Sequence, residues 1–146
     1  MKHISTLFIA ALSLTAIPSV ANAEIIDLST PSTSMILDAN VGSPLRILYY
    51  GDKLTESDIN SLFSSPLAHH DAYPVYGIYP QGEAALSVTH ADGNRTTQME
   101  VTGVKTKNEG NATVTTVAMR DKAYPFEVNV NNRVSPDYDV IETFVD

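Results

Sequence analysis

Two residue types are missing from this sequence: cysteine and tryptophan. Without cysteine the chain can form no disulfide and offers no thiol nucleophile or thiolate ligand, so its stability depends on packing alone. Without tryptophan it lacks the largest aromatic surface on which a ligand ring could stack. Any aromatic binding surface must therefore come from its seven tyrosines and four phenylalanines.

Positively charged residues are also scarce. Nine Lys and Arg face seventeen Asp and Glu among 146 residues, which gives a formal net charge of -8. A chain this acidic repels phosphate backbones and anionic headgroups, so we expect no nucleic acid and no membrane as partners. The sequence has no glycine-rich phosphate loop and no serine in a nucleophile elbow, and we expect no cofactor.

The first 23 residues have the organisation of a secretory signal peptide. Lys2 precedes an apolar stretch from Leu7 to Ile17, and Ala21-Asn22-Ala23 offers small residues before a cleavage site. The apolar stretch is shorter than the roughly 20 residues needed to span a bilayer. We therefore predict cleavage after Ala23 and a periplasmic or secreted domain of residues 24–146. That domain is too short for an enzyme barrel of about 250 residues.

Short runs of alternating polar and apolar residues predict strands along residues 24–146. In the clearest run, from Tyr124 to Val130, every second residue is apolar, as in a half-buried antiparallel strand. Asp92-Gly93 and Glu109-Gly110 have the composition of hairpin turns. The other expected strands are 24–29, 33–39, 45–50, 86–90, 98–106, 112–120 and 139–145.

One segment departs from this alternation. Thr55-Glu56-Ser57-Asp58 resembles a capping box, Ile59 and Leu62 follow at helical spacing, and Pro66 would end the helix. Short strands separated by frequent turns favour an all-β fold. We predict an antiparallel β-sandwich with one short helix.

The acidic residues do not suggest catalysis. A glycosidase needs two carboxylates, about 5 Å apart for retention and further apart for inversion. Here the acids lie in predicted turns or on the polar side of predicted strands, so we expect no catalytic residue. The acids considered are Asp52, Asp92, Glu100, Glu109, Asp121, Glu127, Asp137 and Glu142.

Histidines offer a second candidate chemistry. His69-His70-Asp71 places two imidazoles beside a carboxylate, and these groups can bind metals. Adjacent residues of an extended chain point in opposite directions, so they do not converge on one ion, and we expect no metal site. His90 is expected to end a strand and to bond to the turn that follows.

Five tyrosines gather near prolines, and two interpretations stay open for them. They could form a stacking platform for a sugar or an interface anchor. Alternatively, some belong to the core, since Tyr73 lies two residues before Val75 and Tyr49 two after Ile47. The binding residues are therefore left unassigned. The tyrosines are Tyr49, Tyr50, Tyr73, Tyr76 and Tyr79.

Four segments, taken in order, resemble the N-terminal domain of glycoside hydrolase family 36 α-galactosidases. They are an aromatic pair before a glycine in Leu45–Leu54, a tyrosine-proline segment in Ala72–Gly77, the turn His90–Gly93, and Tyr124–Ile141. The resemblance implies part of a large β-sandwich, or supersandwich, followed by a (β/α)8 barrel and a small C-terminal β-domain. The family's catalytic aspartates lie in the barrel, so none is carried over to this chain.

One departure from the family concerns the stretch after the tyrosine-proline segment. Many relatives have an aspartate-phenylalanine-arginine run there, whereas this chain has Tyr79–Ala84 with Glu83 as its one charged residue. No role is assigned to Glu83. The chain also ends inside the family's N-terminal domain, and we expect a fragment or a truncated reading frame.

The resemblance implies a non-catalytic segment of an exported α-galactosidase that removes terminal α-galactose from oligosaccharides. Alone it would be inactive, and its partners would be the catalytic barrel or sister subunits. The alternative is a free-standing carbohydrate-binding or adhesive β-sandwich that uses the tyrosine-rich segment. The absence of tryptophan weighs modestly against this alternative.

Overall fold

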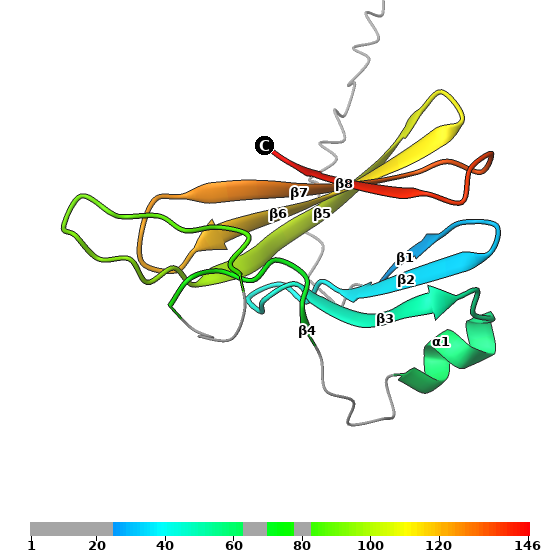
Figure 1. Cartoon of the computed structure of the whole chain (residues 1–146), viewed down its shortest axis with the longest axis horizontal. Helices are drawn as coiled ribbons and strands as arrows, with labels where there is room; N and C mark the ends of the chain where they lie inside the picture. The colour runs from blue at the N-terminus through cyan, green and yellow to red at the C-terminus, as the bar shows by residue number, and fades with distance from the viewer. Residues whose placement is uncertain (1–24, 63–69, 78–82) are drawn as a thin grey trace, which may run out of the picture.

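The structure is a computed structural model that describes residues 25–62, 70–77 and 83–146. Two four-stranded antiparallel sheets lie one above the other, and in each sheet the strands follow the order of the sequence (Figure 1). The predicted all-β sandwich is confirmed. The strands are β1 (Ile25–Ser29), β2 (Thr33–Asp38), β3 (Arg46–Asp52), β4 (His70–Asp71), β5 (Met99–Glu109), β6 (Ala112–Asp121), β7 (Glu127–Val134) and β8 (Ile141–Val145).

Some predictions fall on residues outside the described ranges. These are the signal peptide and its cleavage site, Pro66 as the end of the helix, His69 and Tyr79. No helix in the described ranges is long and apolar enough to cross a membrane.

The hydrophobic core lies between the two sheets. Alternation along each strand directs every second side chain inward, so that apolar residues of β1 and β2 meet those of β5, β6 and β7. Removing such surface from water stabilises the fold by about 25 cal/mol per Å². The core residues on these strands are Ile26, Leu28, Leu37, Met99, Val101, Val117, Met119, Val128 and Val130.

The predicted hairpin of the second sheet is confirmed as β5 and β6. Their ladder runs from Met99 opposite Asp121 to Glu109 opposite Ala112, with one irregularity between Val101 and Gly103. Gly110 closes the turn with a φ of 66°, which a residue without a Cβ adopts at little cost. β6 therefore lies in the middle of the sheet, paired with β5 on one side and β7 on the other.

The predicted helix is confirmed as α1 (Glu56–Leu62). The capping box forms: the Thr55 backbone N–H donates to Asp58 Oδ2 at 3.1 Å, and the Asp58 N–H donates to Thr55 Oγ1 at 3.3 Å. α1 lies on the side of the first sheet away from the second (Figure 1). Ile36, fully buried on β2, alternates with the core residue Leu37 and so faces this outer side.

The predicted strand 86–90 is wrong. The Asp92-Gly93 turn forms, with the Gly93 N–H donating to the His90 carbonyl at 2.9 Å. Its flanks, however, form no ladder, and segment 86–90 has only an isolated parallel bridge from Leu86 to Val75. Burial still alternates along 83–90, so the sequence pattern predicted the buried side correctly and the hydrogen bonding incorrectly.

Two strands begin later than predicted because carboxylates bind the preceding backbone. β7 begins at Glu127 because Asp121 Oδ1 accepts hydrogen bonds from the N–H groups of Ala123 and Tyr124 and holds them in a turn. β8 begins at Ile141 because Asp139 is directed toward the first sheet instead.

Asp139 connects the two sheets at one end. Its carboxylate accepts hydrogen bonds from the hydroxyls of Thr30 and Ser32 and from the Ser32 N–H, all in the β1–β2 turn. The hydrogen bonds from Ser32 and Thr30 hold the pKa of Asp139 below its ordinary value. The β7–β8 connection is thus attached to the first sheet by a charged group at the surface.

Candidate functional site

Tyr49, Tyr50, Tyr73 and Tyr76, the described members of the tyrosine cluster, do not share one environment. Tyr73 is half-buried and packs against the core, and this burial raises its pKa. Tyr49 is half-buried and donates its hydroxyl to the Asp52 carbonyl at 3.0 Å. Tyr50 and Tyr76 are 68% and 45% exposed. The core interpretation therefore holds for Tyr73, and the exposed Tyr50 and Tyr76 remain candidates for the binding role.

Tyr76 belongs to a compact contact between two segments. The Arg95 guanidinium lies 4.7 Å from the centre of the Tyr76 ring, a cation–π distance, and the Thr97 N–H donates to the Tyr76 carbonyl at 3.1 Å. Gly77 has a φ of 113°, and a Cβ placed on it would lie 2.8 Å from Thr96 Cα. This position therefore requires glycine both for its backbone conformation and for its space.

His90 forms part of a corner with Tyr124. The two rings stack with centroids 3.5 Å apart and planes 6° apart. Tyr124 Oη donates to Asp92 Oδ2 at 2.8 Å and accepts from Asn94 Nδ2 at 2.9 Å. The Asn94 hydrogen bond would lower the pKa of Tyr124, but the bond to Asp92 and the nearby carboxylates raise it overall. His90 is thus a structural residue of the turn, as expected, although no strand ends at it.

The corner also keeps Asp92 ionised. The backbone N–H of Asn94 and then the Tyr124 hydroxyl hold the pKa of Asp92 below its ordinary value. His90 Nε2 is buried with no hydrogen-bond partner in the described part of the chain.

The His-Asp motif does not gather into a metal site within the described residues. His70 and Asp71 form β4, where they pair with Ile47 and Arg46 of β3. No group of three or more His, Cys, Asp or Glu side chains in ranges 25–62, 70–77 and 83–146 could hold a metal ion.

Among the acidic residues, Asp121 is 3% exposed, which the sequence interpretation did not predict. Burial by itself would raise its pKa, but three backbone N–H donors, from Gln98, Ala123 and Tyr124, hold the pKa below its ordinary value. Its two oxygens connect the start of β5 to the β6–β7 turn. Asp121 therefore has a structural role, and the other candidate acids lie wholly or partly in solvent.

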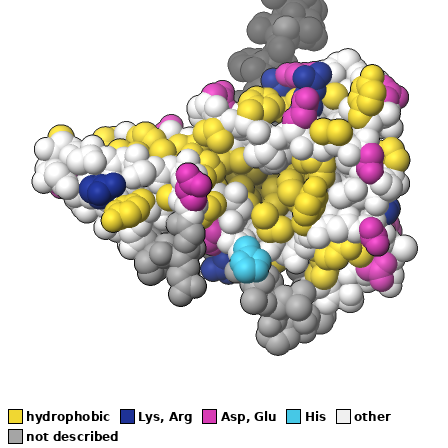
Figure 2. All heavy atoms as spheres, viewed as in Figure 1, with side chains coloured by type: hydrophobic (Ala, Val, Ile, Leu, Met, Phe, Trp, Pro, Cys, Tyr) yellow, Lys and Arg dark blue, Asp and Glu magenta, His cyan; other side chains and the backbone are white. Residues whose placement is uncertain are grey.

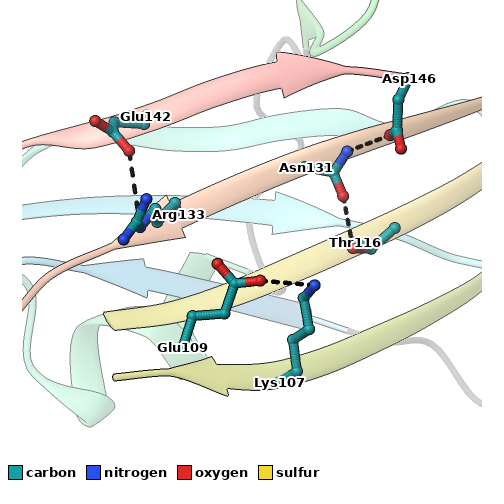
Figure 3. Close-up of polar contacts among 7 residues, drawn as sticks. All are labelled: Lys107, Glu109, Thr116, Asn131, Arg133, Glu142 and Asp146. Carbon is teal, nitrogen blue, oxygen red and sulfur yellow. Dashed lines mark hydrogen bonds and ion pairs between the residues drawn. The ribbon is translucent and has the colours of Figure 1, made fainter. Parts of the chain in front are cut away.

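The outer face of the second sheet carries a band of polar contacts (Figure 3). On β7, Asn131 accepts from Thr116 Oγ1 at 2.6 Å and donates to Asp146 Oδ1 at 2.5 Å. Further along the same strand, Arg133 Nε lies 3.9 Å from Glu142 Oε2 on β8. Cross-strand polar pairs of this kind stabilise a sheet modestly and leave this face suited to water.

A pocket of about 330 Å³ lies at the Arg133 end of this face. It is formed where the β5–β6 turn approaches the β7–β8 connection, since Asn111 Nδ2 donates to Asp137 Oδ2 across them. Sequence reasoning missed it because its walls come from segments that are distant in the chain. The lining residues are Asn111, Ala112, Arg133, Ser135, Tyr138, Val140 and Glu142.

The space-filling view shows a different feature on another side. Hydrophobic side chains gather in a hollow in the middle of the face seen in Figure 2, at the level between the two sheets. Nine partly buried hydrophobic side chains pack against the core without being enclosed by it, among them Met35, Ile47 and Phe126. On the side seen in Figure 2, hydrophobic side chains thus remain at the surface of the sandwich.

Comparisons with known proteins agree with this architecture. A segment of an α-galactosidase of Lactobacillus brevis has the same fold, with a TM-score of 0.68 at 18% identity. A family 36 α-galactosidase of Geobacillus stearothermophilus, a variant bound to 1-deoxygalactonojirimycin, has a TM-score of 0.70 at 15% identity. Each match covers 84% of this chain and 21% of the other, so this chain spans about a fifth of their length. No curated protein matches the chain.

The family assignment comes from the sequence itself. Residues 43–146 match the family model described as the glycosyl hydrolase family 36 N-terminal domain. This range contains β3, α1 and the whole second sheet, and therefore most of the sandwich. The chain belongs to the glycosyl hydrolase family 36 N-terminal domain family.

Proposed function

We propose that this chain is the non-catalytic N-terminal β-sandwich segment of an exported α-galactosidase that acts on terminal α-galactosides. The observation that carries the proposal is the family match over residues 43–146. The structural neighbours support it, because they are α-galactosidases of which a segment this size forms about a fifth.

The geometry of the carboxylates supports a non-catalytic role. Glycoside hydrolysis needs an acid and a second carboxylate held on opposite sides of the scissile bond by rigid elements. In this chain Asp121 accepts hydrogen bonds from backbone N–H groups, and Asp139 accepts hydrogen bonds from the β1–β2 turn. Glu142 faces Arg133 on an open sheet surface. None of these carboxylates lies opposite another across an enclosed cleft in the described ranges.

The hollow between the sheets supports a role in packing against a partner. Exposed apolar surface that gathers in one place is typical of an interaction site. A catalytic (β/α)8 barrel or a sister subunit would cover the hydrophobic side chains seen in Figure 2 and complete the sandwich. In this proposal the segment contributes subunit or domain contacts and leaves the chemistry to its partner.

Export is proposed from the N-terminal residues. Lys2, the apolar stretch from Leu7 to Ile17 and the small residues Ala21 and Ala23 fit a cleaved signal peptide. The intact mass of the protein recovered from the periplasm or medium should correspond to a chain that begins at Glu24. A recovered chain that retains Lys2 would count against cleavage and in favour of an anchor.

The experiment that tests the assignment measures hydrolysis of a chromogenic α-galactoside by the purified chain. We expect a rate equal to the buffer blank, because the described carboxylates Asp121, Asp139 and Glu142 are engaged by backbone donors, by a turn and by Arg133 rather than held as an opposed pair. Turnover that persists through purification and is abolished by changing one carboxylate of this chain would overturn the non-catalytic role. Reading the DNA downstream of the Asp146 codon is a second test: a barrel-coding frame supports the proposal, and an unrelated gene favours a free-standing module.

A further inference from the structure

We propose that the pocket at the end of the second sheet is a binding site for one hexopyranose unit of a neutral oligosaccharide. The pocket is the cavity lined by Asn111, Arg133, Ser135, Tyr138 and Glu142. This inference goes beyond the proposed function, because it gives the segment a ligand of its own. The pocket is also separate from the tyrosine-rich segment, whose tyrosines lie between positions 49 and 79.

The shape of the pocket suits a single sugar ring. Its volume of about 330 Å³ is at the lower end of the range for ligand pockets, which begins at about 300 Å³. Tyr138 is 67% exposed and Val140 56% exposed, so both offer uncovered apolar surface beside the cavity. A pyranose ring has one face rich in C–H groups, which can lie against such a surface, and a tyrosine ring presents a broad apolar face at low entropic cost.

The polar groups of the pocket match hydroxyls, which both donate and accept hydrogen bonds. Asn111 Nδ2 is engaged by Asp137, which leaves Asn111 Oδ1 as an acceptor. The Ser135 hydroxyl accepts from the Asp137 N–H at 3.3 Å, so its own proton is available to a ligand. These two residues are therefore already oriented before a ligand arrives.

The charged groups of the pocket favour a neutral ligand. Arg133 and Glu142 carry opposite charges on the lining and face each other through Arg133 Nε. The remaining Arg133 nitrogens make no hydrogen bond to any described residue and can donate to a hydroxyl, while Glu142 can accept from one. A phosphate or carboxylate would gain from Arg133 but would be repelled by Glu142 and the adjacent Asp137, and a sugar meets no such conflict.

The test is an NMR titration of the purified exported chain with methyl α-galactoside, with methyl α-glucoside and methyl β-glucoside as parallel probes and glycerol as a control. We expect saturable shifts confined to residues 111–112 and 133–142. A dissociation constant of about 1 mM is expected, because a single ring makes few contacts to offset its lost freedom. Glycerol should produce no saturable shift.

Variants separate this pocket from other surfaces. Tyr138→Ala and Arg133→Gln should each weaken binding at least about tenfold, a difference of about 1.4 kcal/mol. Tyr50→Ala is the matched control, because Tyr50 is 68% exposed, as Tyr138 is 67% exposed, but lies on β3 of the other sheet. It should leave binding unchanged. The NMR signals of residues outside the pocket report whether each variant is folded. If Tyr138→Ala does not fold, Arg133→Gln alone provides the test.

Three results would overturn the proposal. The first is equal binding by Tyr138→Ala, Arg133→Gln and the unmodified chain. The second is a set of shifts at residues 73–77 and 95 instead, which would place the sugar on the tyrosine-rich segment. The third is the absence of a saturable shift with all three glycosides. None of these results bears on whether the chain is a segment of an α-galactosidase, so the two proposals fail separately.

Discussion

The second sheet and the segment 83–98 are held in place by different kinds of contact. In the sheet, β6 is paired along its length with β5 on one side, with one irregularity between Val101 and Gly103, and with β7 on the other. In residues 83–90 of the segment, burial alternates as in a strand. The backbone there is nevertheless held by isolated bonds, such as Ala85 N–H to the Pro74 carbonyl at 2.8 Å and His90 N–H to the Asn94 carbonyl at 2.8 Å. Alternation in a sequence therefore reports which side chains face the core, and a ladder needs a neighbouring strand as well.

The largest loss of stability is expected for a core residue of the second sheet. Met119 is 2% exposed on β6, an inner strand of the second sheet. Met119→Ala should lower the free energy of unfolding by about 3 kcal/mol, because it removes buried apolar surface and leaves a cavity. Urea denaturation followed by circular dichroism measures this loss. Arg120→Ala, the exposed neighbour on the same strand, should change stability by less than about 0.5 kcal/mol. Equal effects of the two variants would contradict the assigned faces of β6.

A smaller loss of stability is expected at the boundary between the two regions, where segment 83–98 joins β5. Asp121 Oδ2 accepts from the Gln98 N–H at 2.8 Å, and Oδ1 accepts from Ala123 and Tyr124. In Asp121→Asn one of these oxygens becomes an NH₂ group that cannot accept. We expect a loss of about 2 kcal/mol in the same denaturation experiment.

The pH dependence of this loss identifies its cause. The folded-state pKa of Asp121 lies below the value in the unfolded chain, about 3.9, so its contribution is present above that pH and is lost as the pH falls through the folded-state pKa. The stability difference between the unmodified chain and Asp121→Asn should therefore be constant from neutral pH to about pH 5 and shrink below pH 4. A difference that does not change with pH would show that packing, rather than ionisation, is responsible.

Local patterns were sufficient to predict much of the fold. Alternation predicted β1, β2, β3 and the β5–β6 hairpin, and the reciprocal bonds of Thr55 and Asp58 confirm the predicted capping box. These features depend on residues within a few positions of each other. The late start of β8 could not be predicted, because it depends on Asp139 meeting Thr30 and Ser32 more than a hundred residues away.

The candidate sites were less predictable than the fold for the same reason. Aromatic clustering in the sequence directed attention to Tyr49, Tyr50, Tyr73 and Tyr76, which the fold distributes among different environments. Tyr138, in contrast, stands alone in the sequence and becomes part of a pocket because the β5–β6 turn reaches the β7–β8 connection. The local signal that could have indicated it is an aromatic residue in a turn, flanked by Asp137 and Asp139.

Two glycines, Gly77 against segment 83–98 and Gly93 within it, test whether this segment depends on close packing. Gly77 and Gly93 both have positive φ, 113° and 85°, so alanine is strained at either position. A Cβ at Gly77 would also lie 2.8 Å from Thr96 Cα, whereas nothing lies within 4 Å of a Cβ at Gly93. We expect losses of about 2 kcal/mol for Gly77→Ala and about 1 kcal/mol for Gly93→Ala, measured by thermal unfolding. Equal losses would show that the contact with Thr96 adjusts freely.

The smallest effect on stability is expected at β8, the edge strand of the second sheet. A clear effect on association between chains is expected there. β8 pairs with β7 and has no other strand beside it among the described residues, and Phe144 and Val145 are each 48% exposed. An apolar edge with unpaired backbone groups serves as a template for another strand. The purified chain should therefore form dimers or larger species that increase with concentration in size-exclusion chromatography with light scattering.

Val145→Lys should reduce this association, because Val145 lies opposite Val130 and alternates inward, and an inward-pointing lysine on an edge strand opposes pairing with a second chain. Its effect on unfolding should stay below about 1 kcal/mol, since the side chain is already half exposed. Val140→Lys is the matched control: Val140 is 56% exposed but lies outside β8, so it removes a similar apolar surface without placing charge on the edge. If both variants reduce association equally, general surface hydrophobicity causes it. If the unmodified chain is monomeric at every concentration and residues 141–145 are strongly protected from hydrogen exchange, the β8 edge is not a site of strand pairing between chains.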